Sequence, residues 1–392
     1  MKYLFYLFSC VVFDKEIQYE KSVDYERMFK ICRRHSIANT LYYAIANDPY
    51  CPENIKEKFL EHWFSMTNVQ ARQINEMNRI LEKFNENKIY ILPLKGWEMK
   101  NFYSEPNMRS SCDVDFLIDK EQTSKALNII EQLGFEFSHS TDNHYVYSKD
   151  VVVIECHIQP MCCRCAVNRS EYFSDFPGGE PIEKGSYILR QSNEDLYIYM
   201  LAHMFKHMVS GGFGIRQVLD IYVLLNNPEF SLDKEYIATA VKSAGLADFE
   251  YHIKKLCDIW FCGAQSSDFY DNFTAFILRS GVTGTRTNLN IFRIVSSDTA
   301  ASMRSNKFKL MLYHIYPPRS VLKNNYPLVE KHPALIPFFQ IKRHFDVLFK
   351  RRKDIDVLKN IHSVKQSDTL NAIEILNKVG YFDMNKIKSK NK

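Results

Sequence analysis

The 392-residue sequence lacks any apolar stretch long enough to span a membrane, and it has no internal repeat or low-complexity block. A membrane-spanning helix needs about 20 predominantly apolar residues, and the apolar stretch at residues 1–14 is shorter. No small-x-small cleavage site follows it, which disfavours a signal peptide. We therefore expect residues 1–14 to form a buried first helix and the protein to have no membrane partner.

The chain also has little net charge and no paired cysteine motif. The formal charge is +5, which is small for this length and does not demand a nucleic-acid partner. The ten cysteines include several inside apolar or motif stretches, which favours a reduced, cytoplasmic protein. Cys162, Cys163 and Cys165 lack the separated Cys-x-x-Cys pairs of a structural zinc site, so zinc is disfavoured there.

The composition that remains is typical of a globular protein, with 46% apolar and 25% charged residues. The length suffices for two domains that each bury a core. We expect an α+β fold in which a small mixed β-sheet is flanked by helices. The predicted parts are an N-terminal helical segment at 1–85, a core at 86–190 and a mostly helical C-terminal domain at 191–392.

The local patterns behind this division are helical and strand-like periodicities. Apolar residues recur at helical spacing over 55–85, as one long helix or two, and 121–133 reads as an amphipathic helix that ends at Gly134. Short β-branched or alternating runs indicate strands. These runs lie at 89–92, 114–118, 135–139, 144–148 and 151–157.

Two carboxylates, Asp113 and Asp115, stand at the head of the apolar run Val114–Ile118. Because side chains alternate faces along a strand, the two point the same way and repel one another unless a positive group lies between them. A divalent cation, most often Mg²⁺, is the simplest such group. The alternative is a strand start whose two acids face water.

A lysine-glycine turn and a third acid accompany this pair. Lys95 and Gly96 follow a short strand and precede a helix start, an arrangement that suits an anion, with Lys95 as a charge for phosphate. Glu155 interrupts the β-branched run 151–157, where an acid is costly to bury unless it is paired or bound to metal. We expect Glu155 to be the third metal carboxylate. The alternative is an edge-strand acid paired with a cation such as Arg109.

Further polar residues complete the candidate set. Arg109 and Ser111 precede Asp113, and we assign both to nucleotide binding with Lys95 and Gly96; Arg109 would contact phosphate or neutralise the acids. A second group consists of residues at i, i+3 and i+4 on one helix face, which line the cleft or, alternatively, form a solvated face with one core histidine. These are His203, Lys206 and His207. Arg216 and Asp220, at i and i+4, are interpreted as an ion pair on a helix surface.

The ordered set of Lys-Gly, Arg-x-x-x-Asp-x-Asp and a third acid resembles the DNA-polymerase-β-type nucleotidyltransferase superfamily. It is most similar to the bacterial family of uncharacterised nucleotidyltransferases, and more distantly to the toxin nucleotidyltransferases of abortive-infection systems. The segments at 201–220 and the proline-rich 316–337 also resemble that family. One departure is Trp97, because the superfamily usually has Ser or Thr after the glycine of the turn.

The resemblance implies an enzyme that binds two Mg²⁺ ions, with Mn²⁺ as a substitute, and a nucleoside triphosphate such as ATP. It would transfer a nucleoside monophosphate group to an acceptor hydroxyl with release of pyrophosphate. Asp113, Asp115 and Glu155 would then be catalytic metal ligands. The acceptor would be a small molecule or a protein side chain, and nucleic acid ranks behind both. The alternative is a catalytically degenerate nucleotide-binding or interaction protein on the same fold, which the missing hydroxyl at the turn supports.

Overall fold

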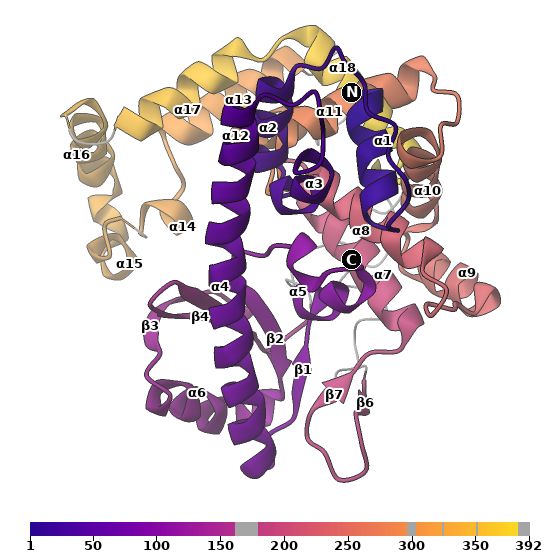
Figure 1. The fold of residues 1–392 in the computed structure, drawn as a ribbon. Helices are drawn as coiled ribbons and strands as arrows, with labels where there is room; N and C mark the ends of the chain where they lie inside the picture. The colour runs from indigo at the N-terminus through magenta and orange to yellow at the C-terminus, as the bar shows by residue number, and fades with distance from the viewer. Residues whose placement is uncertain (161–178, 296–302, 324, 350–351, 383–392) are drawn as a thin grey trace.

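The computed structural model describes residues 1–160, 179–295, 303–323, 325–349 and 352–382 (Figure 1). In this part of the chain, helices surround one small mixed sheet, which confirms the predicted α+β class. None of the described helices combines the length and the apolar character needed to cross a bilayer.

Four helices precede the sheet in the chain, and the first of them packs against a helix from the C-terminal half. They are α1 (Lys2–Val11), α2 (Tyr25–Arg34), α3 (Ala38–Ile45) and α4 (Glu53–Glu86). Seven of the ten residues of α1 are buried, because its apolar side chains contact α3 and α10 (Ala247–Phe261). The prediction of a buried first helix is confirmed, and the long helical pattern at 55–85 is one helix, α4.

The main sheet has the strand order β1-β2-β5-β4-β3, in which only β2 and β5 run parallel. The strands are β1 (Ile91–Pro93), β2 (Val114–Ile118), β3 (Glu136–Ser140), β4 (His144–Lys149) and β5 (Val152–His157). Short helices connect β1 to β2, and a longer one connects β2 to β3. They are α5 (Lys95–Glu98), the 3₁₀ turns η1 (Met99–Phe102), η2 (Pro106–Met108) and η3 (Lys120–Gln122), and α6 (Thr123–Gln132).

The two faces of the sheet have different neighbours. Val114, Phe116 and Ile118 of β2 join an apolar cluster with the second half of α4 and with α6. Because the strand alternates, Asp115 and Leu117 point to the opposite face, and Leu117 belongs to the cluster formed by the remaining helices. One face of the sheet is therefore an apolar layer under α4 and α6 (Figure 1), and the other face carries the acids.

The chain after the sheet passes through a two-stranded ribbon and then becomes helical. The ribbon pairs β6 (Glu180–Pro181) with β7 (Leu189–Arg190). The helices that follow are α7 (Asn193–Val209), α8 (Ile215–Asn226), α9 (Lys234–Ser243), α10, α11 (Asp268–Ser280) and α12 (Arg286–Val295). The division of the chain at residues 190 and 191 falls between β7 and α7 and stays a prediction.

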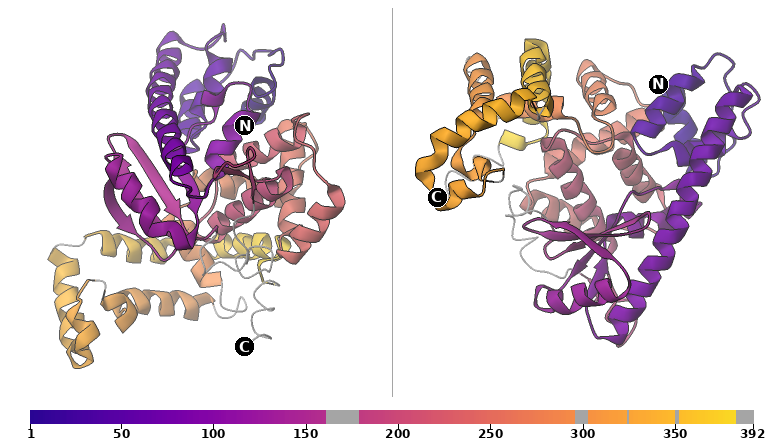
Figure 2. Two further views of the ribbon diagram at one scale, coloured as in Figure 1. Left: turned by 90° about the horizontal axis from the view of Figure 1, so that it is seen from below. Right: turned by 90° about the vertical axis from the view of Figure 1, so that its left-hand side faces the viewer.

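The helices between residues 319 and 349 lie apart from the sheet and its cover (Figure 2), whereas the last helix, at Gln366–Lys378, packs against α11 and α12 and joins the main apolar core. The proline-rich segment predicted to break the helical pattern contains only short pieces. The elements are α13 (Met303–Ile315), α14 (Arg319–Leu322), α15 (Leu328–Lys331), the 3₁₀ turn η7 (Pro333–Leu335), α16 (Ile336–Phe349), α17 (Arg352–Ser363) and α18 (Gln366–Lys378).

Candidate active site

The register of the parallel pair β2–β5 brings the predicted acids together. Asp115 is the direct partner of Glu155, and Leu117 is the partner of His157. Because β2 and β5 run in the same direction, partnered side chains point to the same face of the sheet. Asp115 and Glu155 therefore share the face that lies opposite α4 and α6.

His157 joins these two carboxylates. Its Nε2 lies 3.1 Å from Oδ1 of Asp115 and 3.4 Å from Oε2 of Glu155. One ligand atom from each of the three residues lies within 4.8 Å of the other two. The oxygens of Asp115 and Glu155 at this spacing fit one divalent cation such as Mg²⁺ or Mn²⁺, and Nε2 of His157 is the donor that contacts both, because a carboxylate only accepts.

Asp113 lies next to this three-residue group and not within it. Burial and the neighbouring charge of Asp115 raise the pKa of Asp113. Burial also acts to raise the pKa of Asp115, but Lys95 and His157 outweigh it and hold the pKa of that carboxyl well below its usual range. The hydrogen bond from His157 likewise lowers the pKa of Glu155. Asp115 and Glu155 are thus ionised at neutral pH, in the form that binds a metal.

Lys95 connects the acids to helix α7. Its Nζ lies 3.3 Å from Oδ2 of Asp115 and 2.9 Å from Nε2 of His203. Because an ammonium group only donates, Nε2 of His203 accepts and the ring proton is on Nδ1. Nε2 of His207 lies 3.2 Å from Nε2 of His203.

The two histidines of α7 are neutral. Burial, followed by the charge of Lys95, lowers the pKa of His203 well below its ordinary value and lowers that of His207 to about 3. Lys206 is half-buried on the same helix and contributes to both shifts. The structure therefore places His203 and His207 beside Lys95, so the candidate set predicted from the helix spacing adjoins the acids.

The loop that leads to Asp113 is held through its backbone carbonyls. Asn39 and Gln70 donate to the carbonyl of Asn107, and Thr40 donates to that of Met108. Gln73 of α4 donates to the carbonyl of Ser111 at 3.2 Å. Side chains from α3 and α4 thus fix the approach to the acidic strand.

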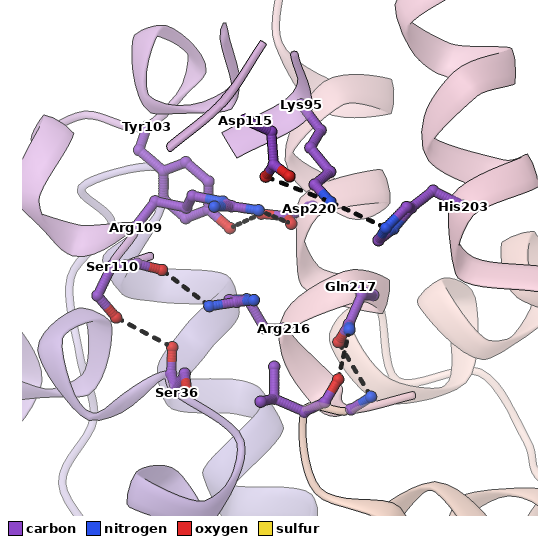
Figure 3. A network of polar contacts seen from close by, with 12 residues as sticks. Ser36, Lys95, Tyr103, Arg109, Ser110, Asp115, His203, Arg216, Gln217 and Asp220 are labelled. Carbon is purple, nitrogen blue, oxygen red and sulfur yellow. Dashed lines mark hydrogen bonds and ion pairs between the residues drawn. The ribbon is translucent and has the colours of Figure 1, made fainter. Parts of the chain in front are cut away.

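Helix α8 holds the same loop from the other side (Figure 3). Asp220 accepts from Arg109 at 2.9 and 3.2 Å and from the hydroxyl of Tyr103 at 2.8 Å. Arg216 donates to the carbonyl of Ser110 at 2.9 Å. The interpretation of Arg216 and Asp220 as a surface ion pair is wrong, because Asp220 is fully buried and pairs with Arg109.

The remaining predicted nucleotide-binding residues adjoin this network. Arg109 is 5% exposed and pairs with Asp220, so its charge is already neutralised. Gly96 is buried, and a Cβ there would lie 3.2 Å from Nη1 of Arg109. Ser111 is also buried, so the nucleotide-binding role of these residues stays a prediction.

Sequence reasoning missed part of the network. The shared strand face of His157 and Glu155 is visible in the sequence, but the nearby cysteines suggested His157 only as a zinc ligand and not as a member of the acidic group. Asp220 and Tyr103 carried no such signal, since they are 117 positions apart.

The cysteines at 162, 163 and 165 lie outside the described residues, whereas Cys10, Cys32, Cys51, Cys112, Cys156, Cys257 and Cys262 are free thiols.

Comparison with known proteins identifies a family for most of the chain. Residues 21–262 match the family described as uncharacterised nucleotidyltransferase, and the proline-rich segment at 316–337 lies outside this match. No curated protein matches the chain.

Two solved structures of ANT(2'')-Ia are also similar at 13% identity. One is the solution structure of this antibiotic-resistance factor, which covers 52% of this chain and 95% of that one with a TM-score of 0.27. The other is the crystal structure with adenylyl-2''-tobramycin, which covers 50% of this chain and 98% of that one with a TM-score of 0.26.

Proposed function

The chain belongs to the uncharacterised nucleotidyltransferase family, and we propose that it transfers a nucleoside monophosphate group from a nucleoside triphosphate to an acceptor hydroxyl in a Mg²⁺-dependent reaction. In this reaction the acceptor oxygen forms a bond to the α-phosphorus. The bond from that phosphorus to the oxygen bridging to the β-phosphate breaks, and pyrophosphate leaves. The acceptor proton passes to a nearby base.

The observation that carries the proposal is the meeting of Asp115, Glu155 and His157 on one face of the sheet. Asp115 and Glu155 would hold the divalent cation, and Asp113, next to them, would be the third carboxylate that binds metal. When bound, the cation would neutralise charge on the phosphates and on the leaving pyrophosphate. Among the described residues, the group of Asp115, Glu155 and His157 is the one whose ligand atoms lie close enough together to hold a metal ion.

The residues around the acids have separate roles in the proposal. His157 orients the two carboxylates, because its Nε2 contacts an oxygen of each. Glu155 is the candidate base for the acceptor proton, since its side chain is 26% exposed while that of Asp115 is 2% exposed. Lys95 contributes positive charge next to Asp115 and, on its other side, contacts neutral His203.

The acceptor is proposed to be a small molecule or a protein hydroxyl. The formal charge of +5 over 392 residues does not favour nucleic acid, which proteins bind largely through phosphate contacts from Lys and Arg.

The test uses the four nucleoside triphosphates labelled at the α-phosphate, with Mg²⁺ and a cell extract as the source of acceptor. The wild-type protein should label an acceptor from at least one triphosphate and release pyrophosphate. Asp113→Asn should lose both activities with an unchanged unfolding transition. Asp150→Asn is the matched control, because Asp150 is exposed in the β4–β5 turn and its φ of 51° suits asparagine. Transfer by Asp113→Asn at the wild-type rate, or no transfer from any triphosphate, would refute the proposal.

A further inference from the structure

Arg216 of α8 contacts the loop before Asp113, and the proposed metal site gives it no role. It is the second residue of α8, and its Nη1 donates to the carbonyl of Ser110 at 2.9 Å. The hydroxyl of Ser110 in turn donates to the carbonyl of Ser36 at 3.3 Å. The guanidinium of Arg216 is therefore held against Ser110, which precedes Asp113 by three residues (Figure 3).

The two neighbouring cations each form an ion pair with a carboxylate, whereas the hydrogen bond of Arg216 goes to a backbone carbonyl. Arg109 has a bidentate partner in Asp220, and Lys95 has Asp115. Arg216 contacts a neutral carbonyl, and its buried Nε has no hydrogen-bond partner among the residues that the structure describes. A guanidinium has five N–H donors, so most of its donor capacity is unassigned.

A second guanidinium, that of Arg109, lies near Arg216. Burial and then the charge of Arg109 lower the pKa of Arg216, and together they outweigh the opposing charges of Asp220 and Asp113. Arg216 is close enough to Asp113 and to His207 of α7 for its positive charge to act to lower the pKa of each. Arg216 is half-buried, and a partly buried cation with unfilled donors is stabilised when an anion joins it.

We propose that Arg216 binds phosphate oxygens of the triphosphate tail, an inference that rests on the function proposed above. A planar guanidinium matches two phosphate oxygens at once, which an ammonium group does not. The bond to Ser110 fixes the guanidinium beside the acidic strand. Asp220, one turn further along α8, neutralises Arg109 and leaves Arg216 as the cation that meets the ligand.

The test uses Mg²⁺-tripolyphosphate as the probe, because it carries the phosphate chain without a base. By isothermal titration calorimetry, Arg216→Gln should weaken binding at least tenfold, and Arg216→Lys should recover only part of the loss. Arg343→Lys is the matched control, since Arg343 is likewise an arginine whose guanidinium donates to a backbone carbonyl, that of Ile315, but it lies on α16. The control should bind the probe as the wild type does.

A second readout separates phosphate binding from a merely structural role. Mn²⁺ binding, followed by electron paramagnetic resonance in the absence of phosphate, should be the same in Arg216→Gln and in the wild type. If Arg216 only held the loop through Ser110, this variant would lose Mn²⁺ affinity together with tripolyphosphate affinity, and that result would overturn the inference.

The inference and the proposed function fail in different ways. Unchanged tripolyphosphate affinity in Arg216→Gln, in a protein whose wild type transfers label, would overturn the role of Arg216 alone. A wild type that binds tripolyphosphate through Arg216 but transfers no label from any triphosphate would overturn the transferase proposal and support the phosphate site.

Discussion

Replacing Asp220 with asparagine removes the charge that neutralises Arg109 while keeping the size of the side chain. The two side chains are 0% and 6% exposed and meet at 2.9 Å. The amide oxygen can still accept from Tyr103, but Arg109 becomes an uncompensated buried cation. Breaking one side of a buried ion pair costs about 3–5 kcal/mol, so we expect Asp220→Asn to lower the free energy of unfolding by that amount.

The assay is urea unfolding of four proteins: the wild type, Asp220→Asn, Arg109→Met and the double variant. Because each single variant leaves the other group buried and unpaired, the double variant should lose much less stability than the sum of the two single losses. A loss below about 1 kcal/mol in Asp220→Asn, or strictly additive losses, would refute the reasoning. Either result would mean that α8 does not hold the loop through this pair.

Two further predictions concern pH. Lys100 is 4% exposed, and burial lowers its pKa from 10.5 to about 8. The folded state therefore binds its proton more weakly than the unfolded state, and stability should rise by about 3 kcal/mol between pH 8 and pH 10.5. Urea unfolding of Lys100→Met should show a smaller rise, and an equal rise would contradict the assignment. Burial also lowers the pKa of His35 from 6.5 to about 4, so the same rule applies in the acid range. Stability should fall by about 3 kcal/mol as the pH drops from 6.5 to 4, because protonation of Nδ1 breaks its bond from the backbone N–H of Ile215. His35→Gln should lose less over this range, and a loss as large as that of the wild type would count against the prediction.

Local sequence patterns were sufficient for the fold class and for the strand that carries the acids. The alternation in Val114–Ile118 predicted that Asp113 and Asp115 share a face, and the β-branched run around Glu155 predicted a second strand. The pairing of these strands was not predictable from either run, because register depends on contacts between segments about 40 residues apart. The structure gives Asp115 and Glu155 as direct partners.

The contacts around the acids were beyond the reach of local pattern. Arg216 and Asp220 have the spacing of a helix-surface pair, and the spacing says nothing of which other segments cover that helix. The structure buries Asp220 under Arg109 and Tyr103. Likewise, Gln70 and Gln73 lie in a polar stretch of α4, yet they are 3% and 0% exposed because they donate to the loop before Asp113.

The central claim is that acids from two adjacent strands hold a divalent cation at the transfer site. Crystals grown with Mn²⁺ and a non-hydrolysable nucleoside triphosphate test it most directly, because manganese is located by its anomalous scattering. The account predicts an anomalous peak within bonding distance of Asp115 and Glu155, with the phosphate chain reaching Arg216. A nucleotide-bound structure whose manganese lies away from both carboxylates would contradict it.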